Sequence, residues 1–163
     1  MRRRHVLKIA AAGAAWLMLP WRLRAAALPP ATEEALKSSD LIYVATRRKD
    51  GTVSEAAPIW FYYRGDGQLF FTTSPDAWKA KRIAAGSPLY IWVGEADGPF
   101  VQGQAQLTTD AALIDQMGAA YADKYWIAWA GFFKPRSSRV ADGKTKAYTV
   151  TLEPAEPPAK KKA

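Results

Sequence analysis

Residues 41–73 read LIYVATRRKDGTVSEAAPIWFYYRGDGQLFFTT. This stretch contains three runs rich in β-branched and aromatic residues, at 41–46, 55–63 and 68–73, and each run is typical of a β-strand. The runs are separated by the polar, glycine-containing turns KDGT and RGDG. Because strands that are joined by tight turns pair antiparallel, the stretch predicts a three-stranded meander.

The rest of the chain continues this pattern, with further strands expected at 89–94, 100–107 and 146–152. The residues Ser74-Pro75-Asp76 are expected to begin a helix that ends at Gly86, and a second helix is expected over 110–122. The aromatic segment 125–133 is expected to be helical or irregular. Six antiparallel strands with a few short helices predict a mainly β (α+β) domain built as a small six-stranded barrel.

The composition excludes several kinds of chemistry. The 163 residues include no cysteine and one histidine, His5, and the formal net charge is +8. Without cysteine there is no disulfide, no thiolate nucleophile and no Cys-ligated zinc or iron–sulfur site. Removal of the N-terminus would also remove histidine acid/base catalysis and histidine metal ligands. We therefore expect no metal site, and the sequence identifies no catalytic side chain.

Residues 1–27 are expected to be a signal peptide. They combine a basic start, an uncharged apolar run over 9–19 and an alanine triplet at 25–27 that suits cleavage. The apolar run is shorter than the ~20 residues that a membrane-spanning helix needs. RRHVLK at 3–8 resembles a twin-arginine signal, which favours export of the folded protein, to the periplasm or otherwise out of the cytoplasm. An ordinary secretory signal and an uncleaved anchor are the alternatives.

The positive charge lies outside the expected domain, which spans 28–153 and precedes a disordered Pro/Lys-rich tail at 154–163. Six of the 23 basic residues and none of the 15 acidic residues lie in 1–27, so the remaining chain has a net charge of +2. Three more lysines lie in the tail, at 160–162, and without them the balance is −1. A basic excess that is confined to a signal and a tail does not indicate nucleic-acid binding. No membrane partner is expected after signal cleavage.

A set of ordered motifs between residues 41 and 152 resembles the pyridoxamine 5′-phosphate oxidase-like family of FMN-binding split β-barrels. The motifs are YVATRRKDG at 43–51, APIWFY at 57–62, LFFTT at 69–73, WKAKRI at 78–83 with Ser87-Pro88, VQGQA at 101–105 and DKYW at 123–126. The resemblance implies a split barrel that forms a homodimer, with a flavin at the subunit interface. The implied cofactor is FMN, with a deazaflavin as the alternative.

The resemblance also implies eight cofactor-binding residues, four along a strand beside the flavin ring and four around its phosphate. In that order they are Ala57, Pro58, Ile59 and Trp60, then Thr72, Thr73, Trp78 and Lys79. The residue types suit these tasks, because indoles provide a flat apolar wall for a ring. Hydroxyls, the free N–H groups of a helix start and a lysine attract a phosphate.

Several of these residues also have a simpler structural explanation. Thr73 is a typical helix-capping residue, and Lys79 is spaced to pair with Asp76 on one helix face. Trp60 suits the core or an interface of a barrel. Tyr125 and its neighbour Trp126 either cover the flavin from the partner subunit or pack a helix on the barrel.

The chain departs from the vitamin B6 oxidase that gives the family its name. Ala56 and Phe61 stand where that enzyme has basic residues, and its C-terminal Arg-x-His segment is missing, so vitamin B6 oxidation is not expected. The leading hypothesis is an exported FMN-dependent oxidoreductase that acts on an unidentified small-molecule substrate or electron donor. The alternatives are a non-catalytic flavin or small-ligand binding protein, a deazaflavin-dependent reductase and a structural dimer with an empty cleft.

Overall fold

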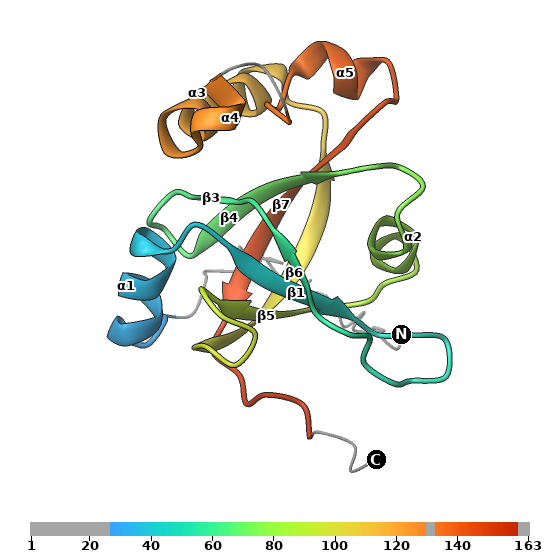
Figure 1. Cartoon of the computed structure of the whole chain (residues 1–163). Helices are drawn as coiled ribbons and strands as arrows, with labels where there is room; N and C mark the ends of the chain where they lie inside the picture. The colour runs from blue at the N-terminus through green and yellow to red at the C-terminus, as the bar shows by residue number, and fades with distance from the viewer. Residues whose placement is uncertain (1–26, 130–132, 160–163) are drawn as a thin grey trace, which may run out of the picture.

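The computed structural model describes residues 27–129 and 133–159, which form one seven-stranded antiparallel sheet with five helices (Figure 1). The strand order is β2-β1-β5-β6-β7-β4-β3. The strands are β1 Ile42–Thr46, β2 Ala57–Ile59, β3 Tyr62–Tyr63, β4 Gln68–Thr73, β5 Leu89–Val93, β6 Phe100–Thr108 and β7 Lys146–Glu153. The helices are α1 Pro30–Ser38, α2 Trp78–Ala84, α3 Ala111–Lys124, α4 Trp126–Trp129 and α5 Ser137–Ala141.

Two expected segments lie partly outside these ranges. Residues 1–26 of the expected signal peptide and residues 160–163 of the expected tail are not among the described residues. Export, signal cleavage and the domain boundaries therefore stay predictions. Within the described ranges, no helix combines the length and apolar character that membrane crossing requires.

The sheet curls so that its two edge strands are consecutive in the sequence. β2 pairs with β1 at one edge, and β3 pairs with β4 at the other. The chain passes from one edge to the other at Trp60 and Phe61, which belong to neither strand. The single strand expected over 55–63 is therefore two strands, which raises the expected number from six to seven. The mainly β, antiparallel split-barrel fold is confirmed.

The interior of the curled sheet holds the main core. Alternate residues of the strands point inward, and their apolar side chains are fully or almost fully buried. Gly103 of β6 lies in this interior, and a Cβ atom there would be 2.5 Å from Cγ1 of Val150. The inward residues include Ile42, Val44, Leu69, Phe71, Leu89, Ile91, Val150 and Leu152.

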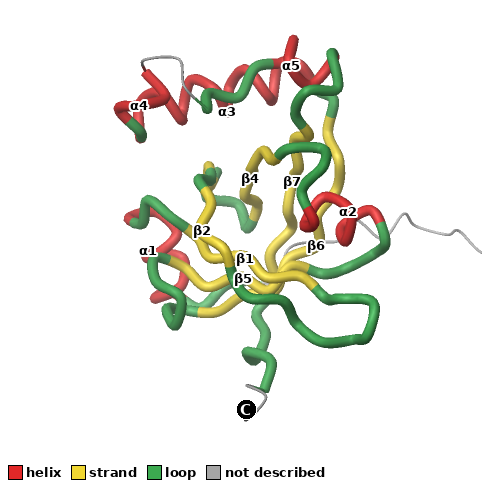
Figure 2. Tube along the Cα trace, turned by 45° about the vertical axis from the view of Figure 1, so that its right-hand side comes forward, coloured by secondary structure: helices red, strands yellow, loops and turns green. Residues whose placement is uncertain are grey.

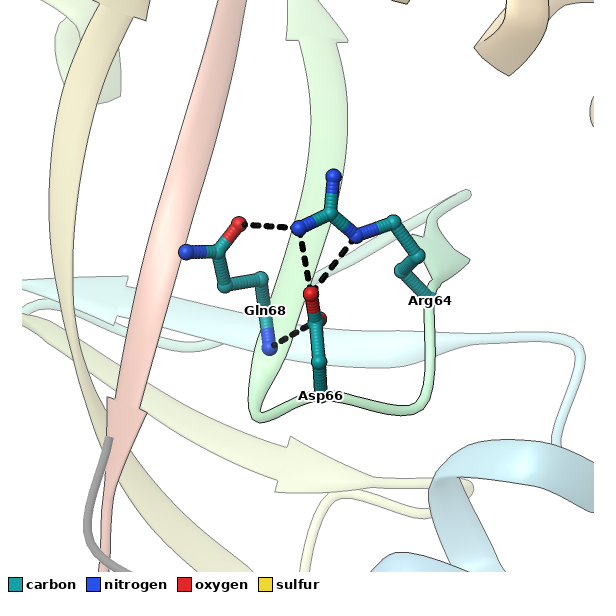
Figure 3. A network of polar contacts seen from close by, with 3 residues as sticks. All are labelled: Arg64, Asp66 and Gln68. Carbon is teal, nitrogen blue, oxygen red and sulfur yellow. Dashed lines mark hydrogen bonds and ion pairs between the residues drawn. The ribbon is translucent and has the colours of Figure 1, made fainter. Parts of the chain in front are cut away.

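The turn between β3 and β4 is closed by side chains (Figure 3). Oδ2 of Asp66 accepts hydrogen bonds from Nε of Arg64, at 2.7 Å, and from its Nη2. Oδ1 of Asp66 accepts from the backbone N–H of Gln68 at 3.2 Å. Gly65 and Gly67 have φ values of 90° and 74°, a region that favours glycine. The expected RGDG turn is confirmed, and it leads into β4.

A layer of helices covers one end of the curled sheet, where α3, α4 and α5 lie together (Figure 2). Helix α3 begins after Asp110, whose side chain accepts from the backbone N–H of Leu113 at 3.2 Å. One face of α3 is buried, with residues at helical spacing: Ile114, Met117, Gly118 and Tyr121. This face holds α3 near Trp60 and Phe61. Farther along the chain, α5 is the element that precedes β7.

Candidate functional site

A cleft of about 800 Å³ lies where Trp60, the end of β4 and the segment 133–145 meet. Its lining combines aromatic, hydroxyl and basic side chains. The lining residues are Ile59, Trp60, Thr72, Thr73, Ser74, Tyr121, Phe133, Lys134, Pro135, Arg136, Arg139, Lys144 and Thr145. The volume is within the range of pockets that hold small-molecule ligands and cofactors.

The structure brings together four of the eight residues that the sequence predicts as cofactor-binding. Ile59 and Trp60 line the cleft from one strand edge, and Thr72 and Thr73 line it from the end of β4. The other four are not among its lining residues. Ala57 and Pro58 are exposed on β2, Trp78 is 69% exposed at the start of α2, and Lys79 is half-buried beside it.

Helix α2 begins at Trp78 and not at Ser74-Pro75-Asp76 as expected, so these three residues lie in a turn before the helix. The residue before the helix is Ala77, so Ser74 does not cap it. Instead, Oγ of Ser74 accepts a hydrogen bond from the backbone N–H of Asp76 at 3.4 Å, within the turn. Within the described ranges Lys79 forms no ion pair, so the expected pair with Asp76 is not formed. Burial lowers the pKa of Lys79.

Aromatic rings line part of the cleft, grouped around Trp60. The indole of Trp60 stacks on Tyr125, with ring centroids 4.4 Å apart and an angle of 6° between the planes. Tyr121 and Phe133 approach Trp60 edge-on, at 6.3 Å and 5.9 Å. Tyr125 is 6% exposed, so it packs α3 against the barrel of its own chain. These ring contacts fix the orientation of the Trp60 indole, which presents a flat apolar surface.

Two tyrosine hydroxyls hold the backbone that carries Trp60. At the crossing between β2 and β3 the chain leaves both ladders, so its backbone groups need other partners. Tyr121 donates to the carbonyl of Trp60 at 2.8 Å. The hydroxyl of Tyr125 accepts from the N–H of Phe61 at 3.2 Å and donates to the carbonyl of Asp40 at 2.7 Å. Tyr121 of α3 and Tyr125, the residue that follows this helix, thus provide the hydrogen bonds that ladder partners would otherwise make.

These two hydroxyls predict a loss of stability at high pH. Burial raises the pKa of Tyr125 from 10.0 to about 12 and raises that of Tyr121 well above 10.0. Because the folded protein binds these protons more tightly than the unfolded chain, the stabilisation is complete below pH 10 and is lost as the pH rises through 12. Urea unfolding should show this fall, and the double variant Tyr121→Phe/Tyr125→Phe should flatten it. An equally steep fall in the double variant would contradict this assignment.

Basic residues and hydroxyls also line the cleft. Four basic side chains line it, and no carboxylate appears among the described lining residues. The hydroxyls come from the end of β4 and from Thr145, just before β7. The four basic residues are Lys134, Arg136, Arg139 and Lys144. Sequence reasoning missed all four, because they lie in a segment without hydrophobic periodicity. The β4–β7 pairing, which brings Lys144 near the end of β4, joins residues far apart in the sequence.

The comparisons with known proteins show the family through one family model and the fold through solved structures. A family model described as pyridoxamine 5′-phosphate oxidase matches residues 28–155. No curated protein matches the chain. Among solved structures, an F420 reductase is 20% identical, with a TM-score of 0.54 over 78% of this chain and 97% of that one.

Two further solved structures share the fold at low identity. A FAD-binding protein from Mesorhizobium loti is 16% identical, with a TM-score of 0.54 over 74% of this chain and 86% of that one. General Stress Protein 26 from Bacillus anthracis is 16% identical, with a TM-score of 0.53 over 74% of this chain and 88% of that one. At such identities the likeness concerns the fold alone.

Proposed function

Because the chain belongs to the pyridoxamine 5′-phosphate oxidase family, we propose that it binds FMN in the cleft and acts as an exported flavin-dependent oxidoreductase. The observation that carries the proposal is the combination of aromatic side chains with cationic and hydroxyl side chains in the lining of one cleft of about 800 Å³. These are the two chemistries that an isoalloxazine ring and a phosphate require. A flavin, when bound, supplies hydride and electron transfer.

The residues of this chain have separate tasks in the proposal. Trp60 and Ile59 give the ring an apolar wall. Tyr121 and Tyr125 keep the backbone of Trp60 and Phe61 in place. Thr72 and Thr73 offer hydroxyls to the phosphate. No side chain is assigned as catalytic, in keeping with a reaction whose reactive centre belongs to the cofactor.

Pyridoxamine phosphate is not proposed as the substrate. Phe61, which stands where the vitamin B6 oxidase has a basic residue, is fully buried in the main core. Ala56, at the other such position, has no charge to offer. The substrate is therefore proposed to be a different small molecule or electron donor.

We also propose that the protein forms a homodimer in which the partner covers the cofactor. The support is a set of large apolar side chains that the single chain leaves on its surface: Trp126 is 81% exposed, Trp78 69% and Leu107 58%. Light scattering of the purified protein should give twice the mass of one chain, and the mass of a single chain would contradict the proposal.

Anaerobic reduction of the FMN-loaded protein tests the proposed activity. Addition of a nicotinamide or quinol donor should bleach the absorbance of the oxidised flavin. Addition of an electron acceptor should then restore that absorbance. If FMN binds but neither nicotinamide nor quinol donors reduce it, the protein is the non-catalytic flavin-binding alternative and not an oxidoreductase. If a deazaflavin binds and FMN does not, the deazaflavin-dependent reductase replaces it.

A further inference from the structure

We infer that the docking of an N-terminal arm, Leu28 together with helix α1, controls whether the bond between Ala27 and Leu28 can be cleaved. The bond is cut while the arm is undocked and is protected once the arm is docked on the barrel. The inference rests on the expected signal peptide, whose alanine triplet ends at Ala27, and not on flavin binding. It makes the choice between a cleaved signal and an uncleaved anchor depend on the state of the fold.

The bond joins an exposed residue to a core residue. Ala27 is exposed, whereas Leu28 is only 9% exposed and belongs to the main core. A protease that binds its target segment as an extended strand needs access to the side chains on both sides of the bond. In the docked arm, the side chain that follows the bond is buried in the barrel and is not accessible to a protease.

The residues after the bond connect it directly to α1. Two prolines follow Leu28, and their rings fix the backbone dihedral φ. The carbonyl of Pro29 accepts hydrogen bonds from the N–H groups of Thr32 and Glu33, at 2.9 Å and 3.0 Å, so the helical hydrogen bonds begin at the residue after Leu28. The chain therefore cannot extend on the far side of the bond while α1 stays in place.

Helix α1 is itself held at the core and beyond its end. Leu36 of α1 is 1% exposed and belongs to the main core. After the helix, the carbonyl of Ser39 accepts from Nζ of Lys124 at 2.5 Å. The next carbonyl, that of Asp40, accepts from the hydroxyl of Tyr125 at 2.7 Å. The arm is thus fixed by the core at its start and by residues at the end of α3 just beyond it.

The turn between β3 and β4 lies beside the bond. A cleft of only about 170 Å³ separates them, with Ala27 and Leu28 in its lining together with Gly65, Asp66 and Gly67 of the turn. The side-chain hydrogen bonds of Asp66 keep this turn closed (Figure 3). The bond is therefore flanked by a fixed turn as well as by the core.

Cleavage of the folded protein then requires the arm to undock. The arm is not a strand of the sheet, so it can open while the sheet stays folded. When opening and closing are fast, the rate of proteolysis follows the population of the open form. A precursor that folds before it is processed therefore keeps its N-terminal segment, whereas a precursor that is processed before the arm docks loses it.

Cleavage of the folded, full-length precursor by a signal peptidase in detergent solution tests the inference. A variant with Gly-Ser-Gly-Ser-Gly inserted between Ala27 and Leu28 should be cut at least about tenfold faster than the native precursor, because the spacer frees the bond while the arm stays docked. Synthetic peptides of residues 1–40, with and without the spacer, are the reference for an accessible bond, since an isolated helix as short as α1 is not stable. The two peptides should be cut at similar rates.

A substitution within the arm provides an independent check. Leu36→Ala should speed cleavage of the precursor without the spacer about tenfold or more, because it removes buried packing that holds α1 on the barrel. Leu89→Ala is the matched control and should leave cleavage slow. Leu89 is equally buried in the main core, but it begins β5 just after α2, and α1 and α2 lie at opposite sides of the molecule (Figures 1 and 2). Circular dichroism checks that each variant is folded.

Slow cleavage of the native precursor that the spacer relieves, with similar cleavage of the two peptides, supports the inference. Equal rates for the two folded precursors would overturn it. A spacer effect of the same size in the peptides would overturn it as well, because the effect would then come from the sequence at the bond. Equal acceleration by Leu36→Ala and Leu89→Ala would show that cleavage requires unfolding of the whole domain and not of the arm. If neither peptide is cut after Ala27, the bond is not a processing site and the inference fails, while the proposed flavin binding is unaffected.

Discussion

Replacing Trp60 by alanine is expected to raise the dissociation constant of FMN about tenfold to a hundredfold, because stacking on an aromatic side chain contributes about 1–3 kcal/mol. Trp60 is placed for this task by its stack on Tyr125 and by its position in the cleft lining. Isothermal calorimetry with FMN measures the change. Trp60→Phe, which keeps a flat ring, should lose much less affinity.

A second variant distinguishes the two indoles that the sequence predicts near the cofactor. Trp78 is 69% exposed, and its ring packs against its own helix, with the Lys81 ammonium 5.0 Å from the ring centroid. If the ring of FMN lies at Trp60, Trp78→Ala should change affinity much less than Trp60→Ala. The reverse order would place the cofactor against α2 and contradict the site described above.

Replacing Tyr125 by alanine is expected to give the largest loss of stability, about 3–5 kcal/mol, because it removes a buried ring together with its hydrogen bonds. The ring stacks on Trp60, and the hydroxyl serves the N–H of Phe61 and the carbonyl of Asp40. A loss of this size is a large fraction of the 5–15 kcal/mol that typically stabilises a domain. Urea unfolding at neutral pH measures it.

The hydroxyl and the ring of Tyr125 can be separated. Tyr125→Phe keeps the ring and leaves the backbone groups at the crossing unpaired, so it should cost about 1–3 kcal/mol. Tyr90→Phe is the matched control, because within the described residues the hydroxyl of Tyr90 makes no hydrogen bond, and it should cost less than about 0.5 kcal/mol. Equal effects of the two phenylalanine variants would show that the Tyr125 hydroxyl does not hold the crossing.

The local patterns of the sequence were sufficient for the strands and the turns. Alternating and β-branched runs predicted every strand region, and the RGDG turn formed as expected, because these features depend on neighbouring residues. The break between β2 and β3 was not predictable in this way. The break arises because residues 57–63 pair with β1 in their first half and with β4 in their second half. This double pairing depends on how the whole sheet curls.

The candidate site also depends on contacts between residues far apart in the sequence, which local patterns do not predict. Trp60 and Thr73 were predicted from their motifs, and both line the cleft. The partners that give them a role are distant in sequence: Tyr121 holds Trp60 from 61 residues away, and the β4–β7 ladder brings residues 144 and 145 beside Thr73. A single sequence without internal symmetry carries no local signal for such contacts. Lys79, predicted from its motif alone, lies outside the cleft lining.

The absorbance spectrum of the protein purified from its own host tests the central claim most directly, when combined with mass analysis of whatever the protein releases on denaturation. We predict the spectrum of an oxidised flavin and a released compound with the mass of FMN, at about one per chain. A colourless protein that also fails to take up added FMN would contradict the account.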